Sequence, residues 1–535
     1  MTLDPDVTLA VVRGVVWPPA SRQVTAVAVS GERIVAVGTD EEILAMVPPG
    51  ARVIDARGAT VMPALNDAHV HFMMGSRSLA DLDLAGADTQ ATVERRIRDF
   101  VATIPEREWV VGRGWWYSAF PGGMPGIEAL DRLVPDRPAY LESYDAHTAW
   151  VNSRALAIAG LKATDAGGTR AGILKESAMQ GVRRHLPQPT PEMDREAVRS
   201  GMRLAASHGI ASVQEAGHGL KQVELYQTLL EHGELTMRIR LAFDMEPGLD
   251  AAEWERRLEL YQEASHAVPP NDWIGTGILK AFADGVVESG TAALLEPYAD
   301  MSPAGPGAFG TPFWERGELA NAVRAADARG WQIQVHAIGD AAIRDALDAF
   351  EACNPSRRHR IEHIEAPATD DLGRFAALGV IASMQPQHAE PTHNLLGAWA
   401  PKLGAARASG GWPWASILRS GGRLAFGSDW PVVPIDPFGS LHVAVNRQTR
   451  SGEPSGGWVG SERLEVADAV AAWTSGSAYA ERSEPVKGHL RKGMLADIAI
   501  LDRDLMAAPI SELADIKVAA TVVGGGVVYE ARVAD

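Results

Sequence analysis

Short apolar runs alternate with longer amphipathic segments through the middle of the chain. Segments 318–330 and 340–352 repeat apolar residues every three or four positions, which is the period of a helix with one buried face. The runs between such segments are short and apolar, as expected of buried strands in a parallel sheet. We predict eight of these strands: Thr60–Leu65, Ile210–Glu215, Met237–Phe243, Thr276–Ala281, Gln332–His336, Arg360–His363, Val380–Met384 and Arg423–Gly427.

Eight successive βα units predict the α/β class and a closed (β/α)8 TIM barrel, which we place at residues 63–480. The gap after the first strand is too long for one connection, so residues from about 72 to 209 should form an inserted, partly helical lid. Long insertions on this face of a barrel usually serve binding. The lid contains "GRGWWYSAFPGG" and "YDAHTAWVNSRAL", which are rich in aromatic and hydrogen-bonding groups.

Both ends of the chain have the pattern of short β-strands. The runs "TLAVVRGVVW" and "VTAVAVSGERIVAVG" lie near the N-terminus, and "ADIAILDRD" and "VAATVVGGGVVYEARV" lie near the C-terminus. Because chain ends often lie near one another, we expect residues 1–62 and 481–535 to form one small β domain beside the barrel.

The composition is that of an ordinary globular protein. The 535 residues exceed what one hydrophobic core normally serves, and the formal charge of −18 disfavours nucleic acid and anionic membranes as partners. Cys353 is the only cysteine, which excludes an internal disulfide and a thiolate metal cluster. We find no basic leader and no apolar run of about 18 residues, so we expect a cytoplasmic protein that acts on a small molecule.

Five of the predicted strands place ionisable side chains at or just beyond their carboxyl ends. In "NDAHVHF", two histidines stand two positions apart, so they point the same way if the segment is extended. Each group alone has an ordinary explanation as a core histidine, a solvated lysine or a turn aspartate. Together at one barrel mouth they suggest a metal site, since imidazole and carboxylate bind zinc and similar divalent ions. The groups are His69, His71, Lys280, His336, His363 and Asp429.

Lys280 fits a metal site only if its charge is removed. Burial beside two cations would lower the pKa of its ammonium group and expose a nucleophilic amine. Reaction of this amine with carbon dioxide would give a carbamate, whose two oxygens could bridge two metal ions.

The motifs "VMPALNDAHVHF", "LKAFADG", "QVHAIGD", "IEHIEA" and "FGSDWPV" resemble those of the amidohydrolase superfamily. The resemblance is to amidohydrolase family 3, the group of YtcJ-like and N-substituted formamide deformylase-like enzymes, and it spans nearly the whole chain. It implies a metal-dependent barrel flanked by a β-sandwich made from both termini. It also implies that His69, His71 and Asp429 hold one metal, that His336 and His363 hold the other, and that Lys280 bridges them as N6-carboxylysine. Zinc is the expected metal, with iron, manganese or cobalt as alternatives.

The sequence departs from the family pattern at two places. Ala64 stands where a glycine usually follows the proline of the first motif. Glu288-Ser289-Gly290 stands where many members have Gly-Ser-Arg. If that arginine contacts substrate in those members, the substrate class differs here.

Two metal ions can share a hydroxide and polarise a carbonyl group, which favours hydrolysis. We therefore expect this chain to cleave a C–N bond of amide or formamide type, other than a peptide bond. The bridging hydroxide would attack, and Asp429 would accept its proton and pass it to the departing amine.

Two alternatives use the same scaffold in other ways. A one-metal deaminase usually lacks the bridging lysine and has a glutamate three residues after the fifth-strand histidine, where this chain has Gly339. A non-catalytic scaffold protein would be expected to have lost metal ligands. Metal content of about two, one or no ions per chain would distinguish the three.

Further residues could contact substrate or shape the pocket. Trp115 and Trp116 could form an apolar wall, and three lid residues could orient substrate or stabilise an oxyanion. Ordinary packing explains each of these residues equally well or better. The oligomeric state is left open, with a homodimer as one arrangement, since such barrels often pair. The remaining candidates are His147, Trp150 and Asn152 in the lid and His388 after the seventh strand.

Overall fold

The structure is a computed structural model that describes residues 6–18, 24–144, 148–161 and 172–531. The chain divides into two compact units. The larger unit contains residues 1–71 and 202–535, and the smaller one contains residues 72–201. The candidate metal ligands all belong to the larger unit.

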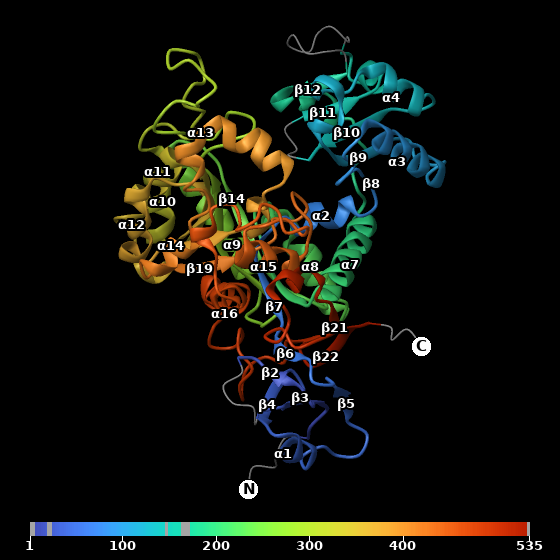
Figure 1. Cartoon of the computed structure of the whole chain (residues 1–535), viewed down its shortest axis with the longest axis vertical. Coiled ribbons are helices and arrows are strands. Elements are labelled where there is room, and N and C mark those ends of the chain that lie inside the picture. Colours follow the sequence, from blue (N-terminus) through green and yellow to red (C-terminus); the bar gives the residue numbers. More distant parts are fainter. Residues whose placement is uncertain (1–5, 19–23, 145–147, 162–171, 532–535) are drawn as a thin grey trace. The chain divides into compact units, whose positions relative to one another are not determined.

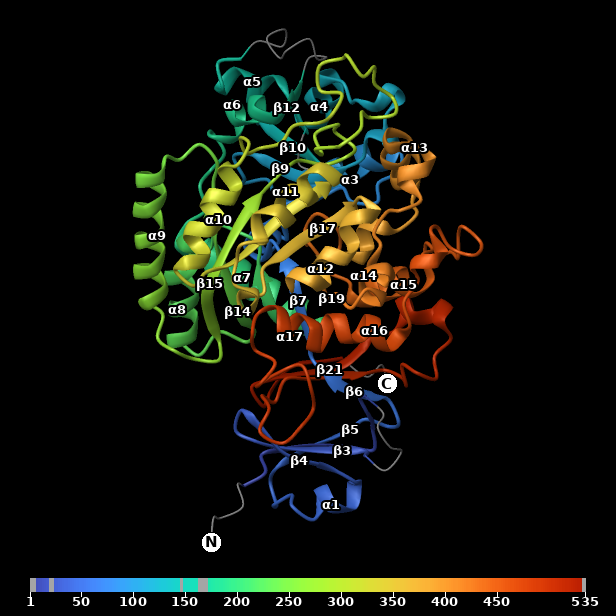
Figure 2. The same ribbon diagram turned by 90° about the vertical axis from the view of Figure 1, so that its left-hand side faces the viewer.

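The larger unit is built on a barrel of parallel strands (Figures 1 and 2). Among the described residues, eight strands pair in chain order, each parallel to the next. The first and last strands meet at their carboxyl ends, where the Asp429 amide donates to the His69 carbonyl at 2.7 Å. The predicted barrel fold is confirmed. Its strands are β7 (Leu65–Val70), β13 (Ile210–Glu215), β14 (Arg238–Met245), β15 (Ile274–Phe282), β16 (Gln332–Gly339), β17 (Arg360–Ala366), β18 (Ile381–Met384) and β19 (Arg423–Phe426).

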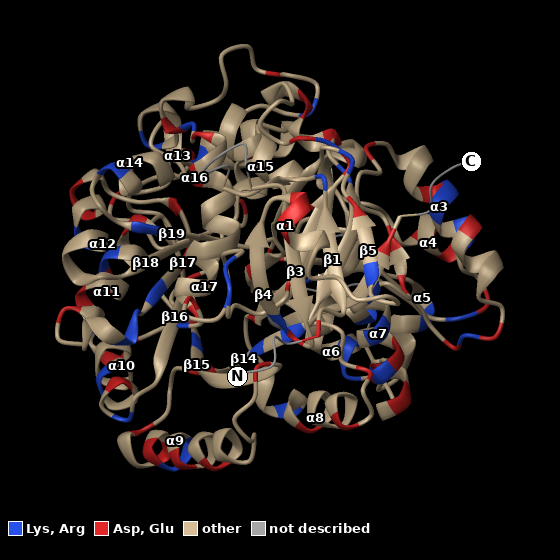
Figure 3. Cartoon of the chain, turned by 90° about the horizontal axis from the view of Figure 1, so that it is seen from below, with Lys and Arg blue, Asp and Glu red and all other residues tan. Residues whose placement is uncertain are grey.

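Helices follow these strands and cover the outside of the barrel (Figure 2). The helix α11 (Asp340–Phe350), for example, buries Ile343 and Leu347 on its apolar face, whereas α15 (Pro437–Asn446) is buried on all sides. Acidic and basic residues are interspersed on the outer helices (Figure 3). The other helices of this layer are α8 (Val223–Glu231), α9 (Ala251–His266), α10 (Glu318–Ala328), α12 (Leu372–Leu378) and α14 (Trp414–Arg419).

The prediction of the first barrel strand was wrong. The segment Thr60–Pro63 (β6) pairs antiparallel with β20 (Ile498–Leu501) in a different sheet, and the barrel strand β7 follows it. The apolar pattern could not reveal β7 because this strand buries polar side chains. Asn66 donates to Glu481 at 2.7 Å, and Asp67 accepts from the Ser428 hydroxyl at 2.6 Å. The other seven predicted strands each overlap a strand of the barrel.

Strands from both ends of the chain form two further sheets that share one apolar core. Leu9, Val27, Val61, Ile498 and Val522 are among the residues of this core. The two sheets form a sandwich, while its predicted limits at residues 62 and 481 stay a prediction. One sheet contains β4 (Arg33–Gly38), β3 (Ala26–Ser30), β1 (Leu9–Val12) and β5 (Arg52–Asp55), and the other contains β2 (Val15–Val16), β6, β20, β21 (Val518–Val523) and β22 (Gly526–Glu530).

The smaller unit is an α/β structure with a core of its own. Its apolar side chains gather between the sheet and the helices α3 (Gln90–Thr103) and α4 (Ile127–Leu133). None of the helices in the described ranges of the whole chain is long and apolar enough to span a membrane. The sheet contains β12 (Ile173–Lys175), β11 (Thr148–Val151), β10 (Ala139–Ser143), β9 (Val110–Trp115) and β8 (Leu82–Asp83), and further helices are α2 (Phe72–Ser78), α5 (Ser153–Ile158) and α6 (Gln180–Arg183). The helix α7 (Pro191–Ser207) begins in this unit and ends in the larger one.

Candidate metal centre

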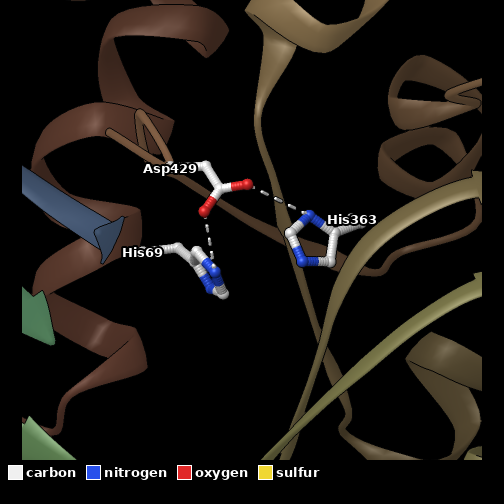
Figure 4. A group of neighbouring side chains, drawn as sticks. All are labelled: His69, His363 and Asp429. Atoms are coloured by element: carbon white, nitrogen blue, oxygen red, sulfur yellow. Dashed lines mark ion pairs between the residues drawn. The ribbon is translucent and has the colours of Figure 1, made fainter. Parts of the chain in front are cut away.

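The side chains singled out at the strand ends meet at the carboxyl end of the barrel. His69 lies near the end of β7, and Asp429 lies three residues beyond β19. The Asp429 carboxylate is central, with Oδ1 3.4 Å from Nε2 of His69 and 3.5 Å from Nε2 of His71. Its Oδ2 lies 3.9 Å from Nδ1 of His363 (Figure 4). His336 joins the group, with its ring 4.5 Å from that of His363.

The donor atoms are spaced for a cation. His69, His363 and Asp429 each offer one ligand atom, and these atoms lie within 4.8 Å of one another. Three polar atoms here are buried without a hydrogen-bond partner in the described structure: His69 Nε2, Lys280 Nζ and Asp429 Oδ1. Leaving a buried polar group unpaired costs about 1–3 kcal/mol. Cations bound between these groups would remove that cost for the imidazole and the carboxylate, so the residues fit the metal site that the sequence predicts.

Burial sets the protonation states that metal binding needs. Loss of solvation lowers the pKa of His71 to about 3 and that of His336 to about 3, so both imidazoles are neutral ligands at neutral pH. Burial also lowers the pKa of the Lys280 ammonium group to about 8. Burial disfavours the Asp429 carboxylate, but the neighbouring His388 and His69 outweigh it and hold its pKa well below the usual range.

Two charged residues beneath the centre were missed by the sequence analysis. Glu362 Oε2 lies 2.7 Å from Nδ1 of His69, and Oε1 lies 3.1 Å from Nε of Arg360. Burial opposes ionisation of Glu362, yet the charge of Arg360 and the hydrogen bond from His69 prevail and lower its pKa to about 2. The carboxylate therefore fixes the ring so that Nε2 faces the site. The sequence did contain a signal for this pair, because Arg360 and Glu362 stand two positions apart in a strand that was predicted to be buried.

A close approach of two strand ends positions Asp429. A Cβ atom added to Gly427 would collide with the backbone nitrogen of His69 and would lie 2.8 Å from its carbonyl oxygen. Asp67 holds the same junction by accepting from the Ser428 amide at 2.9 Å. Glycine is therefore required in "FGSDWPV" so that Asp429 can stand beside His69. Asp429 itself has φ of 60°, a backbone conformation that is uncommon outside glycine.

A second group of possible ligands does not offer the same chemistry. Asp327, Cys353 and His359 also have donor atoms within 4.8 Å of one another. However, Nδ1 of His359 accepts from the Ile333 amide at 3.1 Å, so its Nε2 carries the proton and donates to Asp327 at 3.1 Å. Because this imidazole has no lone pair to give, the group is a buried hydrogen-bond network.

A cavity of about 280 Å³ lies at the opposite, amino end of strands β13, β14 and β15. Its charged side chains are already paired. Nε of Arg238 lies 2.7 Å from Asp497, and Lys487 and Arg240 both pair with Glu481. Because these cations are paired with buried carboxylates, they are not available to bind a ligand in the cavity. The metal centre is therefore the candidate active site.

The structure corrects the view of three residues in the inserted unit. Trp115 and Trp150 are fully buried, and their indole nitrogens donate to the carbonyls of Leu141 and Gly126. Asn152 accepts from two backbone amides and donates to two carbonyls, at 2.8–3.0 Å, which caps α5. Their side chains hold the core of the unit rather than line a pocket.

The other substrate-contact candidates have different outcomes. Trp116 is half-buried, and its contact with substrate stays a prediction. His147 lies outside the described residues. His388 lies at the metal centre, where its Nε2 is 3.1 Å from Oδ2 of Asp429.

A family model described as "Amidohydrolase family" matches residues 52–529. The chain belongs to this family. It is thus a hydrolase of a family that depends on metal ions, as the sequence motifs predicted. Metal dependence agrees with the buried ligand atoms at the barrel mouth that have no hydrogen-bond partner in the described structure.

Three curated relatives are similar over nearly the whole chain. Protein LONG AFTER FAR-RED 3 of Arabidopsis thaliana is 30% identical over 94% of this chain and 88% of its own length. The putative amidohydrolase YtcJ of Bacillus subtilis is 26% identical, covering 90% of this chain and 91% of that protein. The N-substituted formamide deformylase of Arthrobacter pascens is 26% identical, covering 94% and 95%.

Among solved structures, an uncharacterized metal-dependent hydrolase from Pyrococcus horikoshii shares the fold of this amidohydrolase. The TM-score is 0.75 at 24% identity, and the match covers 94% of this chain and 99% of that one. The likeness supports the arrangement of the barrel and its flanking sheets.

Proposed function

We propose that this amidohydrolase uses two divalent metal ions to hydrolyse a C–N bond of amide or formamide type in a small molecule. The observation that carries the proposal is the set of buried, unpaired donor atoms around Asp429. The name of the A. pascens relative supports the bond type.

The ligands would divide into two sets. His69, His71 and Asp429 would hold one ion, and His336 and His363 would hold the other. Zinc is the ion we propose, with iron, manganese or cobalt as substitutes that suit the same donors. When bound, the two ions would supply an activated water molecule and polarise the scissile carbonyl.

Lys280 would link the two sets as a carbamate. Its amine is buried, lies 4.4 Å from the centre of the Phe282 ring, and has no hydrogen-bond partner in the described structure. The lowered pKa makes a neutral, nucleophilic amine available near neutral pH. Addition of carbon dioxide to the neutral amine would form an N–C bond and release one proton. Counted from the ammonium form, two protons leave and the side chain changes from a cation to an anion.

Asp429 would move the proton. Its carboxylate stays ionised at neutral pH and can accept a proton from the attacking water. Once protonated it is a strong acid, so it can give that proton to the departing amine, which would otherwise leave as an unstable anion. His388 would hold the carboxylate through the 3.1 Å contact to Oδ2.

The test combines metal content with a hydrolysis screen of amides and formamides. We expect about two ions per chain after reconstitution, and Asp429→Asn should lower kcat by about a hundredfold or more, as expected for loss of a general acid–base group. His232→Gln is the matched control, because His232 is exposed at the end of α8 and its side chain has one hydrogen-bond partner among the described residues, the Thr228 carbonyl. Full turnover by Asp429→Asn, or no retained metal in the wild type, would refute the proposal.

A further inference from the structure

A histidine and an aspartate form a hydrogen-bonded pair at the barrel mouth that the proposed mechanism does not use. His218 lies three residues after β13, and Asp244 is the last residue but one of β14. Nδ1 of His218 lies 3.1 Å from Oδ2 of Asp244, and the His218 amide donates to Oδ1 at 2.8 Å. The carboxylate therefore holds both the ring and the backbone of His218.

The strand register places Asp244 beside the metal centre. Asp244 stands directly opposite Lys280 in the pairing of β14 with β15, two strands that lie side by side (Figure 2). Paired residues of parallel strands point to the same face of a sheet, so Asp244 faces the barrel interior as Lys280 does. Its neighbour Phe243 points outward, where its ring lies 5.1 Å from that of Tyr261 in α9. Asp244 therefore lines the mouth next to Lys280 without belonging to the proposed ligand set.

The turn that carries His218 passes close to both of these side chains. Gly217 has a φ of 130° and His218 has a φ of 59°, and positive values are uncommon for residues other than glycine. A Cβ atom added to Gly217 would lie 3.0 Å from Oδ1 of Asp244 and 3.9 Å from Cγ of Lys280. Glycine lets the turn approach the carboxylate, and the two contacts from Asp244 hold His218 in its uncommon conformation. The backbone is thus shaped to bring this imidazole to the mouth.

One ring nitrogen of His218 is committed to Asp244 and the other is available. The side chain is 76% exposed, and its Nε2 has no hydrogen-bond partner in the part of the chain that the structure describes. The hydrogen bond to Asp244 raises the pKa of the imidazole, although the charges of Lys221 and Lys280 oppose this. A protonated imidazole donates from both nitrogens, so Nε2 can offer a second N–H to a bound molecule.

A lysine adds positive charge next to His218. Lys221 is exposed in the 3-10 helix η4 (Gly219–Gln222), and its amide donates to the His218 carbonyl at 3.2 Å. Its charge acts on both His218 and Asp244, and its ammonium group has no ion pair among the residues described. Asp244 can balance only one of the two cations. A protonated His218 therefore leaves net positive charge, which suits an anionic oxygen group such as a carboxylate.

We propose that His218 is a specificity-determining residue, whose Nε2 donates a hydrogen bond to a carboxylate that the substrate carries beyond its scissile bond. Asp244 is the positioning residue that orients the ring. The inference rests on the proposed function, because it names the class of substrate for the same site. It adds no ligand to the metal centre and leaves the role of Asp429 unchanged.

The test uses three formamides of matched size that differ in one group: a carboxylate, a neutral carboxamide and an ammonium. The wild type should prefer the carboxylate over the carboxamide by about tenfold or more in kcat/KM, the usual value of one charge-assisted hydrogen bond. His218→Asn should bring this ratio toward one, mainly through KM, and asparagine tolerates the left-handed backbone. Asp244→Asn should also lower the ratio, which a purely structural role would not do. His232→Asn, the same change at the exposed end of α8, is the control.

A binding measurement separates the subsite from the reaction. Calorimetry of metal-loaded protein should show that butyrate binds about tenfold more tightly to the wild type than to His218→Asn, while butyramide binds both alike. Equal affinity for butyrate, or cleavage of all three formamides without a preference for the carboxylate, would refute the subsite and leave the hydrolase standing. If none is cleaved, the proposed function fails, and the butyrate measurement still decides the subsite. Should His218→Asn unfold, His218→Gly, which accepts positive φ without strain, carries both tests.

Discussion

Nδ1 of His69 lies 2.7 Å from Oε2 of Glu362, and neither side chain reaches solvent. An ionised carboxylate there fixes the proton of His69 on Nδ1, so that the lone pair of Nε2 faces Asp429. Arg360 holds the carboxylate in turn, and two glutamines, Gln214 and Gln334, accept hydrogen bonds from its guanidinium group. The metal centre therefore rests on a buried chain of charges inside the barrel.

Glu362→Gln should weaken metal binding without removing any ligand. The amide can still accept from His69, but it lacks the negative charge that makes the imidazole a better donor. We expect a loss of about 10–100-fold in metal affinity, the usual effect of changing such a supporting residue. Competition with a chelator measures this directly, and Glu351→Gln serves as the control, because Glu351 pairs with Arg374 after the outer helix α11. Unchanged affinity in a folded Glu362→Gln protein would show that the contact has no such role.

Gly427→Ala should destabilise the barrel at the junction of β7 and β19. The new methyl group would meet the backbone of His69, which cannot move aside as a side chain could. Overpacking of this kind costs about 1–3 kcal/mol. The matched control is Gly373→Ala in the exposed helix α12, where nothing lies within 4 Å of the added Cβ. That change should be neutral or stabilise by up to about 1 kcal/mol, and equal unfolding free energies for the two variants would contradict the assignment.

The convergence of side chains at the mouth could be predicted because parallel strands end on one rim. His336 and Asp429 followed apolar runs that were recognisable as strands, so their positions near the carboxyl ends of those strands could be predicted. The strand β7 could not be predicted from the hydropathy pattern, because Asn66 and Asp67 are polar and yet buried against partners hundreds of positions away. Glu362 was missed although it lies in a predicted strand, where Arg360 two positions before it was the only sign of a buried ion pair. A hydropathy pattern records burial of apolar groups, while paired buried charges leave almost no trace in it.

Lys280→Met should remove the dependence of metal loading on carbon dioxide. In the wild type, bicarbonate in the buffer should speed recovery of metal by the stripped protein, because the carbamate must form before it can bridge two ions. The variant should retain fewer ions per chain and should not respond to bicarbonate. Metal analysis of both proteins, with and without bicarbonate, tests this. Equal loading of the wild type in carbon dioxide-free and bicarbonate buffers would argue against the carbamate.

Acid should destabilise the protein partly through His359, away from the metal centre. Burial lowers the pKa of this imidazole to about 4 from its usual 6.5. The unfolded chain therefore binds a proton between these pH values that the folded chain rejects, so stability falls as pH drops from about 6.5 to about 4. The loss from this one group is on the order of 3 kcal/mol. His359→Gln should show a shallower decline of unfolding free energy in that window, and an unchanged slope would contradict the assigned pKa.

Two variants of the inserted unit should distinguish a residue that stabilises its core from a residue that contacts substrate. Asn152 makes four hydrogen bonds to the backbone, so Asn152→Ala should destabilise residues 72–201 by about 1–3 kcal/mol. Hydrogen exchange should show faster opening of β10 and α5, while the barrel strands keep their protection. Trp116→Ala is the comparison, because this side chain is half-buried and its contact with substrate stays a prediction. It should raise KM with little change in exchange, since a side chain outside the core contributes less to folding. If Asn152→Ala instead raised KM while exchange stayed unchanged, the residue would act on substrate and the structural assignment would be wrong.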